Sequence, residues 1–386
     1  MKFAILNKRF GLAIALAGCF SAYAGAETLK IGVISPQTGG GAPWGIAASE
    51  AMKMIAADYN ARGGLVSGGK TYQIEVISYD DQYKAADAVA AYHRLRDRDG
   101  VNIMLIHTSP AAVATKDMVE EDHVVAICSC ASPNAVTKDS KYMIRMNSTP
   151  DDYLPGMIKG YAAAFKQRRL IMVNPNDEVG VPFVKQLIPE YKKNGFDIVD
   201  SELYERDTKD FNPLITRILG MNPDVIDLGG TAPATTGLVV RQIREQGYKG
   251  LIIKTAAPSP KEIVAAAGKE AAEGMMLNLF ADQTNEGFKQ VAARYKARIG
   301  QDPNDMIVPV YDGASVLYRA IELSGDPTDT SKIVAAFPKA LPMKSVQGDE
   351  LIWGGKDTIG IDHEVISTEY IGVIHNGEPV VIGKAR

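Results

Sequence analysis

Hydroxyl-proline pairs recur where strand-like segments of this chain pass into helix-like ones. They are Ser35-Pro36, Ser109-Pro110, Ser132-Pro133, Thr149-Pro150 and Ser259-Pro260. A hydroxyl at the N-cap followed by proline starts a helix well, and this role alone would be structural. Such a start also leaves backbone N–H groups and the positive end of the helix dipole facing outward, where carboxylates bind. Because open α/β sheets bind ligands at the carboxyl ends of their strands, the pairs indicate an anion site there.

Enzymatic and metal chemistry have weaker support in the sequence. His107 near Ser109 could pair a base with a nucleophile, but adjacent strand residues point to opposite faces, which counts against it. Cys128 and Cys130 have a spacing that rarely suits a disulfide, and no His or Cys cluster lies nearby to complete a metal site, so two small semi-buried thiols are favoured. The segment GGGAPWG lacks the Gly-Lys-Ser/Thr ending of a phosphate loop. We therefore expect no enzyme activity, no metal and no cofactor.

The first 26 residues have the features of an export signal. A head with three basic residues precedes an apolar run over 10–20, which is too short to span a bilayer. Ala24-Gly25-Ala26 fits the small-x-small rule for signal peptidase. We expect cleavage before Glu27 and a location in the periplasm.

A second interpretation of the same segment is a lipid anchor. Leu16-Ala17-Gly18-Cys19 also fits a lipobox, which would acylate Cys19 and tether the protein to a membrane. Lipid-anchored proteins usually carry a flexible polar segment after the cysteine, and residues 20–27 are not polar. Export as a soluble protein is therefore favoured.

The composition without this leader indicates two lobes and no nucleic-acid partner. The remaining 360 residues are too many for one ordinary core. They hold 39 Lys and Arg against 46 Asp and Glu, without basic runs, and such a chain is a poor nucleic-acid binder. No later apolar stretch reaches the length of a transmembrane helix.

Strand-like and helix-like segments alternate along nearly the whole chain. Short β-rich runs such as LKIGVIS, VNIMLIH and RLIMVN are separated by helical periods that often end in glycine. This alternation predicts an α/β fold, with parallel sheets covered by helices on both faces. After residue 340 the pattern changes to strands punctuated by turns, and His375-Asn376-Gly377-Glu378 is a hairpin signal.

The order and spacing of several segments resemble a known family. The segments are LKIGVISPQTGGGAPWG, a long helix ending NARGGL, TYQIEVISYDDQ, YMIRMNSTPDD, GGTAPATTGLVVRQIREQGYKG and VPVYDGASVLYRAIELSG. Together they resemble the leucine/isoleucine/valine-binding family, type I periplasmic binding proteins that serve ABC transporters. The resemblance covers essentially all of the chain after the leader.

The resemblance implies two doubly wound α/β lobes joined by three crossings, with the ligand clamped between them. The crossings would fall near Asn147-Ser148, near residues 277–280, and after about Ser345. Lobe 1 would then hold residues 27–147 plus 278–345. Lobe 2 would hold residues 148–277 plus 346–386.

The residues that would hold a ligand carboxylate in this family match well. A serine at the end of the third strand falls on Ser109 in HTSPAA, beside Thr108. The small-residue turn one strand later falls on Cys130-Ala131-Ser132, and the aromatic of the first Gly-rich loop falls on Trp44. From their places in the chain, Tyr83 could line the cleft and Phe280 could close its apolar side.

The residues that would hold a ligand ammonium do not match. The family's tyrosine of the second lobe falls on Val179, an aromatic falls on Thr231, and the acidic partner of the ammonium falls at or beside Ala256. Between Gly229 and Pro260 the only acid is Glu245, in mid-helix. A buried ammonium without a carboxylate partner costs several kcal/mol or more.

Three further residues have two interpretations each. Arg145 could hold an anion, but the family carries an arginine there and a structural ion pair is favoured. Asp177 and Glu178 could replace the lost partner of an ammonium, although solvent exposure is the favoured interpretation.

The leading hypothesis is a periplasmic receptor that delivers a small carboxylate to an ABC importer and closes about its hinge on the ligand. The mismatch at Val179, Thr231 and Ala256 favours an aromatic or branched carboxylate without an α-amino group over the amino acids that are the family default. The expected partners are this ligand and the permease subunits, and we expect a monomer. The alternative is a ligand-sensing receptor module of the same fold, for amino acids or amides.

Overall fold

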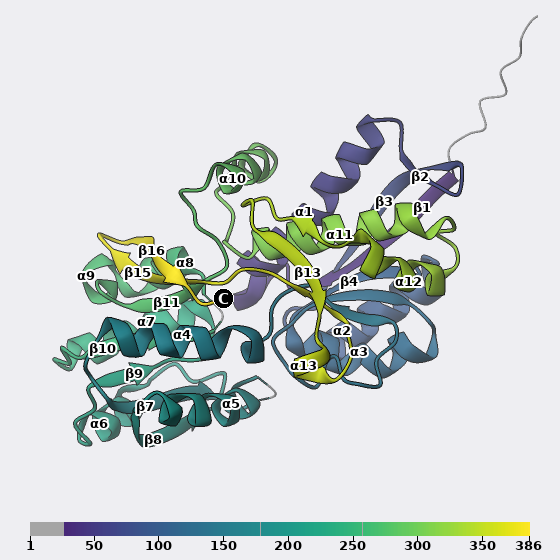
Figure 1. The fold of residues 1–386 in the computed structure, drawn as a ribbon. Coiled ribbons are helices and arrows are strands. Elements are labelled where there is room, and N and C mark those ends of the chain that lie inside the picture. The colour runs from purple at the N-terminus through teal and green to yellow at the C-terminus, as the bar shows by residue number, and fades with distance from the viewer. Residues whose placement is uncertain (1–26, 178, 257) are drawn as a thin grey trace, which may run out of the picture.

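Two β-sheets with helices on both faces form the two lobes of the computed structural model (Figure 1). It describes residues 27–177, 179–256 and 258–386. The predicted α/β fold class is confirmed. The expected signal peptide over residues 1–26, the lipobox cysteine Cys19 and the acid Glu178 lie outside the described residues.

The first lobe is built on a nine-stranded sheet whose central strands are parallel. Its edge pairs β2–β3, β12–β13 and β13–β14 are antiparallel. In spatial order the strands are β12 (Met343–Lys344), β13 (Glu350–Gly354), β14 (Glu364–Ile366), β6 (Met143–Arg145), β5 (Val125–Ser129), β4 (Ile103–His107), β1 (Glu27–Ser35), β3 (Lys70–Asp80) and β2 (Leu65–Ser67).

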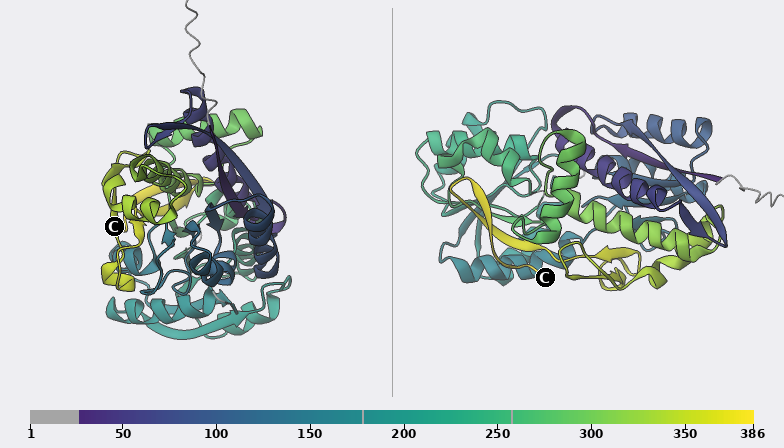
Figure 2. Two further views of the ribbon diagram at one scale, coloured as in Figure 1. Left: turned by 90° about the vertical axis from the view of Figure 1, so that its right-hand side faces the viewer. Right: turned by 90° about the horizontal axis from the view of Figure 1, so that it is seen from above.

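Helices cover both faces of this sheet. One face buries a core with α1, α10, α11 and α12, and the other buries a core with α2 and α3. Figure 2 shows α1 and α11 side by side over this lobe, as their mutual contacts require. The helices are η1 (Gly39–Gly41), α1 (Ala42–Ala61), α2 (Ala85–His93), η2 (Arg94–Arg98), α3 (Ser109–Glu121), α10 (Glu286–Ile299), α11 (Ile307–Ser324), α12 (Thr330–Ala340) and α13 (Lys356–Ile359).

The second lobe repeats this plan on a seven-stranded sheet. Strands β7 to β11 run parallel, and β15 and β16 add an antiparallel edge. In spatial order they are β16 (Glu378–Lys384), β15 (Tyr370–His375), β11 (Met276–Leu279), β10 (Leu251–Lys254), β9 (Val225–Asp227), β7 (Arg169–Pro175) and β8 (Asp197–Tyr204). The covering helices are α4 (Pro150–Ala164), α5 (Gly180–Lys193), α6 (Asn212–Leu219), α7 (Pro233–Glu245), α8 (Pro260–Ala267) and α9 (Lys269–Ala272).

The hairpin signal at residues 375–378 lies where it was expected. His375 pairs with Glu378 across the turn between β15 and β16. Asn376 and Gly377 both have positive φ, at 52° and 81°. Such angles belong to the two-residue turns that fit the twist of a hairpin, and Asn-Gly adopts them at little cost.

Only some of the hydroxyl-proline pairs start helices. Thr149 is the N-cap of α4, Ser259 precedes Pro260 at the start of α8, and Ser109-Pro110 form the first turn of α3. Ser35-Pro36 and Ser132-Pro133 start none. A Gly-rich segment follows the first of these, so that the helix begins at Ala42, and turns follow the second.

The chain passes between the two sheets three times. It leaves the first sheet after β6 and leaves the second after β11, close to the positions expected from the resemblance. It enters the second sheet for the last time after Ile366, at residues 367–369. The Ser148 hydroxyl donates to the Ser367 carbonyl at 2.7 Å and accepts from its N–H at 2.9 Å, so the first and third crossings are joined.

The position of this third crossing differs from the sequence prediction. We expected residues 346–386 to belong to the second lobe, but β13 and β14 pair in the first sheet. The C-terminal segments accordingly appear in both lobes, β13 in one and β15 and β16 in the other (Figure 1). A charged contact joins β14 to β6.

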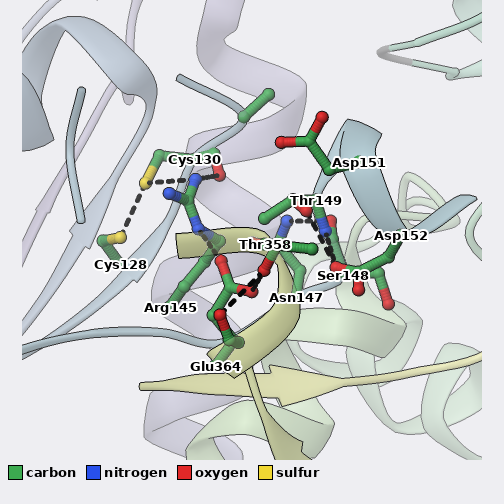
Figure 3. Close-up of polar contacts among 12 residues, drawn as sticks. Cys128, Cys130, Arg145, Asn147, Ser148, Thr149, Asp151, Asp152, Thr358 and Glu364 are labelled. Atoms are coloured by element: carbon green, nitrogen blue, oxygen red, sulfur yellow. Dashed lines mark hydrogen bonds and ion pairs between the residues drawn. The ribbon is translucent and has the colours of Figure 1, made fainter. Parts of the chain in front are cut away.

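Arg145 and Glu364 form this contact as a fully buried ion pair (Figure 3). Arg145 Nε donates to Glu364 Oε1 at 2.9 Å, and both side chains have no exposed surface. Burial raises the pKa of Glu364, and the charge of Arg145 opposes that rise. Arg145 therefore forms a structural ion pair, which was the interpretation favoured from the sequence.

The first prediction concerns the stability contributed by this pair. Replacing one partner, in Arg145→Met or in Glu364→Leu, leaves a buried charge alone and should cost about 3–5 kcal/mol of unfolding free energy. The double variant should recover most of this loss, because an apolar pair needs no desolvation of charge. Denaturant titration of all four forms gives the coupling energy.

The pair Arg319–Glu322, in which Arg319 is exposed and Glu322 is half-buried, supplies a control. Arg319→Met should leave the denaturation midpoint unchanged. If the double variant lost the sum of the two single losses in unfolding free energy, the losses would not come from breaking the charge pair.

Candidate ligand-binding site

A cavity lies between the lobes, at the carboxyl ends of β1, β3, β4 and β5 and against the starts of α4 and α5. Its volume of about 90 Å³ holds roughly six to nine waters, which is the size class of a small organic acid. The wall residues are Trp44, Tyr83, His107, Thr108, Ser109, Ser129, Cys130, Ala131, Pro133, Asn147, Ser148, Pro150, Tyr153, Val179, Phe183, Gln186, Gly230, Ala256, Phe280 and Met306.

Most of the residues expected at a ligand site lie in this wall. They are Trp44, Tyr83, Thr108, Ser109, Cys130, Ala131, Val179, Ala256 and Phe280. These residues come together because the two lobes meet at the cavity. The wall residues before residue 147 belong to the first lobe, and Val179 and Ala256 belong to the second. Their contact with a ligand stays a prediction.

Ser132 and Thr231 were also expected there, but they are not in the wall. The Ser132 hydroxyl accepts from the N–H of Asn134 at 3.3 Å, so it caps a turn. The carbonyl of Thr231 accepts from the buried ammonium of Lys254 at 2.5 Å, which holds the loop after β9 inward. Pro133 and Gly230 take their places in the wall.

Hydroxyl groups and the start of a helix form one end of the cavity. Thr108 is the N-cap of α3, with φ of 92°, an angle that a β-branched residue rarely adopts. Such strain costs on the order of 1–3 kcal/mol and often marks a functional site. The Thr108 hydroxyl is buried without a hydrogen-bond partner among the described residues. The neighbouring Ser109 hydroxyl accepts from the N–H groups of Ala131 and Ser132, each at 3.1 Å.

The described wall residues include no Asp, Glu, Lys or Arg. Asp177, one of two acids considered as a partner for an ammonium, accepts from the Val179 N–H at 2.9 Å and forms an ion pair with Arg206. The other, Glu178, lies outside the described residues. The described part of the wall therefore offers no countercharge to an ammonium.

Cys128 and Cys130 are buried free thiols. Cys130 lies in the wall, and its carbonyl accepts from Arg145 at 2.7 Å (Figure 3). Burial raises the pKa of Cys128. The interpretation as two small thiols agrees with this environment, although they are more deeply buried than expected.

Sequence reasoning missed several wall residues, of which His107 is the most informative. It was expected to point away from Ser109, yet both line the cavity. The two residues are two positions apart at the end of β4, so they are not the adjacent pair to which the alternation of faces applies. Neither ring nitrogen of His107 has a hydrogen-bond partner among the described residues, so the two do not form a Ser–His pair.

Polar contacts between the lobes lie beside the cavity. Trp44 Nε1, in the first lobe, donates to Ser259 Oγ of the second lobe at 2.6 Å. Asn304, between α10 and α11, donates to the same oxygen at 2.6 Å and to Glu262 Oε1 at 2.8 Å. The guanidinium of Arg206 lies 4.9 Å from the ring centre of Tyr83. These contacts hold the lobes closed over the cavity.

Comparison with known proteins identifies relatives over nearly the whole chain. The family model described as "Periplasmic binding protein" matches residues 28–378. The leucine-, isoleucine-, valine-, threonine- and alanine-binding protein of Pseudomonas aeruginosa is 27% identical over 333 residues, which is 85% of this chain and 87% of that protein.

Solved structures share the fold. One is a branched-chain amino acid transporter substrate binding protein from Streptococcus pneumoniae in complex with isoleucine, with a TM-score of 0.79 and 22% identity, over 92% of this chain and 100% of that one. Another is an ABC transporter solute binding protein from R. palustris in complex with benzoate, with a TM-score of 0.77 and 18% identity, over 93% and 96%.

The second prediction concerns closure. Asn304→Ala removes both hydrogen bonds of this side chain across the lobes, and Asn304 is not a wall residue of the cavity. The open form should gain population, because each such bond contributes about 1 kcal/mol. Small-angle scattering should then give a larger radius of gyration for the variant than for the wild type. The exposed substitution Lys289→Ala should leave the profile unchanged, and equal profiles for all three proteins would contradict the assignment.

Proposed function

The chain belongs to the periplasmic binding protein family and is a solute-binding protein of ABC transporters, and on that premise we propose that its ligand is a small aromatic or branched carboxylate without an α-amino group. Members of this family bind solutes and do not catalyse a reaction. The family also implies a location outside the cytoplasm. The observation that carries the proposal is the lack of any acidic side chain among the described wall residues.

The carboxylate is assigned to the end of the cavity at Thr108 and Ser109. The Thr108 hydroxyl can donate to an anion, and α3 directs the positive end of its dipole toward the same place. A carboxylate held by such donors needs no cation in the wall. A carboxylate at this end would also supply a hydrogen-bond partner for the buried Thr108 hydroxyl, which has none among the described residues.

The remainder of the ligand is assigned to the apolar part of the wall. Trp44, Phe183 and Phe280 present rings there, and Val179 and Ala256 add small apolar surfaces. An apolar tail gains about 25 cal/mol for each Å² buried against them. An ammonium would lose its hydration without meeting a carboxylate. The free-energy cost of this desolvation exceeds the gain from burying the apolar tail.

The relatives include binders of both ligand classes. One binds branched and small amino acids by its name, and another was solved with benzoate. The wall of this chain favours the second class.

We further propose that the closed form delivers its ligand to permease subunits in the membrane and that the protein acts as a monomer. We also propose that residues 1–26 direct export as a cleavable signal peptide rather than through a lipid on Cys19. None of the described helices combines the length and the apolar character that a membrane span requires.

The third prediction compares matched ligands. Phenylpropionate should bind more tightly than phenylalanine, and 4-methyl-2-oxopentanoate more tightly than leucine, because only the amino acids must bury an ammonium. Isothermal titration of the wild type measures all four. Tighter binding of the amino acid in both pairs would reject the proposed ligand class and favour the family's amino acids.

The fourth prediction concerns the carboxylate end. Thr108→Val keeps the branched shape but removes the hydroxyl, so affinity for phenylpropionate should fall by about 1–3 kcal/mol. The same change replaces a buried unpartnered hydroxyl by a methyl group and should leave the ligand-free protein equally stable or more stable.

Thr115→Val is the control for this variant. The Thr115 hydroxyl is also buried, but it donates to the Ala111 carbonyl at 2.8 Å and lies outside the cavity wall. Affinity should not change in this control. Unchanged affinity in Thr108→Val as well would remove Thr108 from the site.

A further inference from the structure

We infer that His107 is a specificity-determining residue, whose imidazole forms a hydrogen bond with an uncharged hydroxyl group on the ligand. The inference rests on the proposed function, and it adds a second polar group to the carboxylate. It also assigns a role to a residue that the sequence analysis had set aside.

The first observation is an unmet hydrogen-bonding capacity. His107 is the last residue of β4 and is only 2% exposed. Both ring nitrogens are buried and have no partner among the described residues. Leaving such groups unpaired is unfavourable, because they lose their hydrogen bonds to water, so buried polar atoms in proteins nearly always have partners. Since His107 lines the cavity, a molecule bound there can supply the partner.

The protonation state of His107 narrows the chemistry of that partner. Burial lowers the pKa of His107 to about 4. The other titratable side chains in the described wall are Tyr83, Tyr153 and Cys130, and none is a carboxylate that would hold an imidazolium. The ring is therefore neutral near pH 7, with one nitrogen as donor and the other as acceptor.

A hydroxyl group is the ligand group that suits such a ring best. It can accept from one imidazole nitrogen or donate to the other, whereas a carboxylate only accepts and an ammonium only donates. A carboxylate could accept from the N–H of the ring but would leave the other ring nitrogen without a partner.

Asn147 supports the same conclusion independently. This side chain is 7% exposed, lines the cavity and donates its amide N–H to the Ser148 carbonyl at 2.9 Å. Its Oδ1 atom is buried and has no partner among the described residues. An unpaired acceptor in the wall calls for a ligand group that can donate a hydrogen bond. A hydroxyl donates, and a second carboxylate would be repelled.

The test compares benzoate with 3-hydroxybenzoate and 4-hydroxybenzoate by isothermal titration at pH 7. We expect the wild type to bind at least one hydroxylated acid about tenfold or more tightly than benzoate. His107→Leu should lower the affinity for that hydroxylated acid about tenfold more than it lowers the affinity for benzoate. His107→Gln, which keeps a donor and an acceptor, should retain part of the wild-type preference.

A spectroscopic measurement separates a direct hydrogen bond from a structural role of the ring. With ¹⁵N-labelled histidine, the His107 signals are those missing from the His107→Gln spectrum. The hydroxylated acid should shift them while the ring stays neutral. An imidazolium signal in the complex would mean that His107 meets the carboxylate instead, and would overturn the inference.

The remaining outcomes distinguish this inference from the proposed function. Equal affinities of the wild type for all three acids would overturn the role of His107 and leave the carboxylate proposal standing. An equal loss of affinity for all three acids in His107→Leu would also overturn the role of His107 and leave the carboxylate proposal standing. If the wild type bound none of the three acids but bound leucine, the proposed function would fail, and the inference with it.

Discussion

The buried ion pair between Arg145 and Glu364 fixes the part of the molecule on which the site depends. A guanidinium inside a protein must have its charge balanced and its donors used. Arg145 pairs with Glu364 and donates to the Cys130 carbonyl at 2.7 Å (Figure 3). It also donates to the Ser132 carbonyl at 3.1 Å, while its Nη2 atom has no hydrogen-bond partner among the described residues. The same side chain therefore positions the loop after β5, which forms one wall of the cavity and whose N–H groups bond the Ser109 hydroxyl. Binding geometry in the first lobe is coupled in this way to a strand near the end of the chain.

Local sequence pattern predicted most of the fold but did not place the crossings between the lobes. The family resemblance placed the third crossing after about Ser345, whereas the chain crosses at residues 367–369. Alternating apolar runs and helical periods predicted the α/β class, and the Asn-Gly pair predicted the last hairpin. The pattern after residue 340 predicted strands but could not say to which sheet each would pair. β14 pairs with β6 where Glu364 meets Arg145, 219 positions earlier in the chain. A contact of this range leaves no trace in the spacing of nearby residues.

The sequence indicated which backbone positions lie near the candidate site, but it did not indicate which side chains point into the cavity. The expected residues that follow strands line the cavity, because the carboxyl ends of parallel strands meet there. Ser132 and Thr231 turn out of the wall, since one caps a turn and the other lies in a loop held by Lys254. The positive φ of Thr108 could not be foreseen either, because that angle usually indicates glycine. His107 became visible only with burial and hydrogen bonding known.

The distribution of the last strands has a consequence for how the chain reaches its native state. β14 pairs with β6 in one sheet, and β15 pairs with β11 in the other, so both sheets are incomplete until residues 364–375 are available. The two lobes are thus not independent folding units, although each has its own core. High contact order of this kind slows folding, because long loops must close before their contacts form. Vectorial, lobe-by-lobe folding during synthesis is therefore disfavoured.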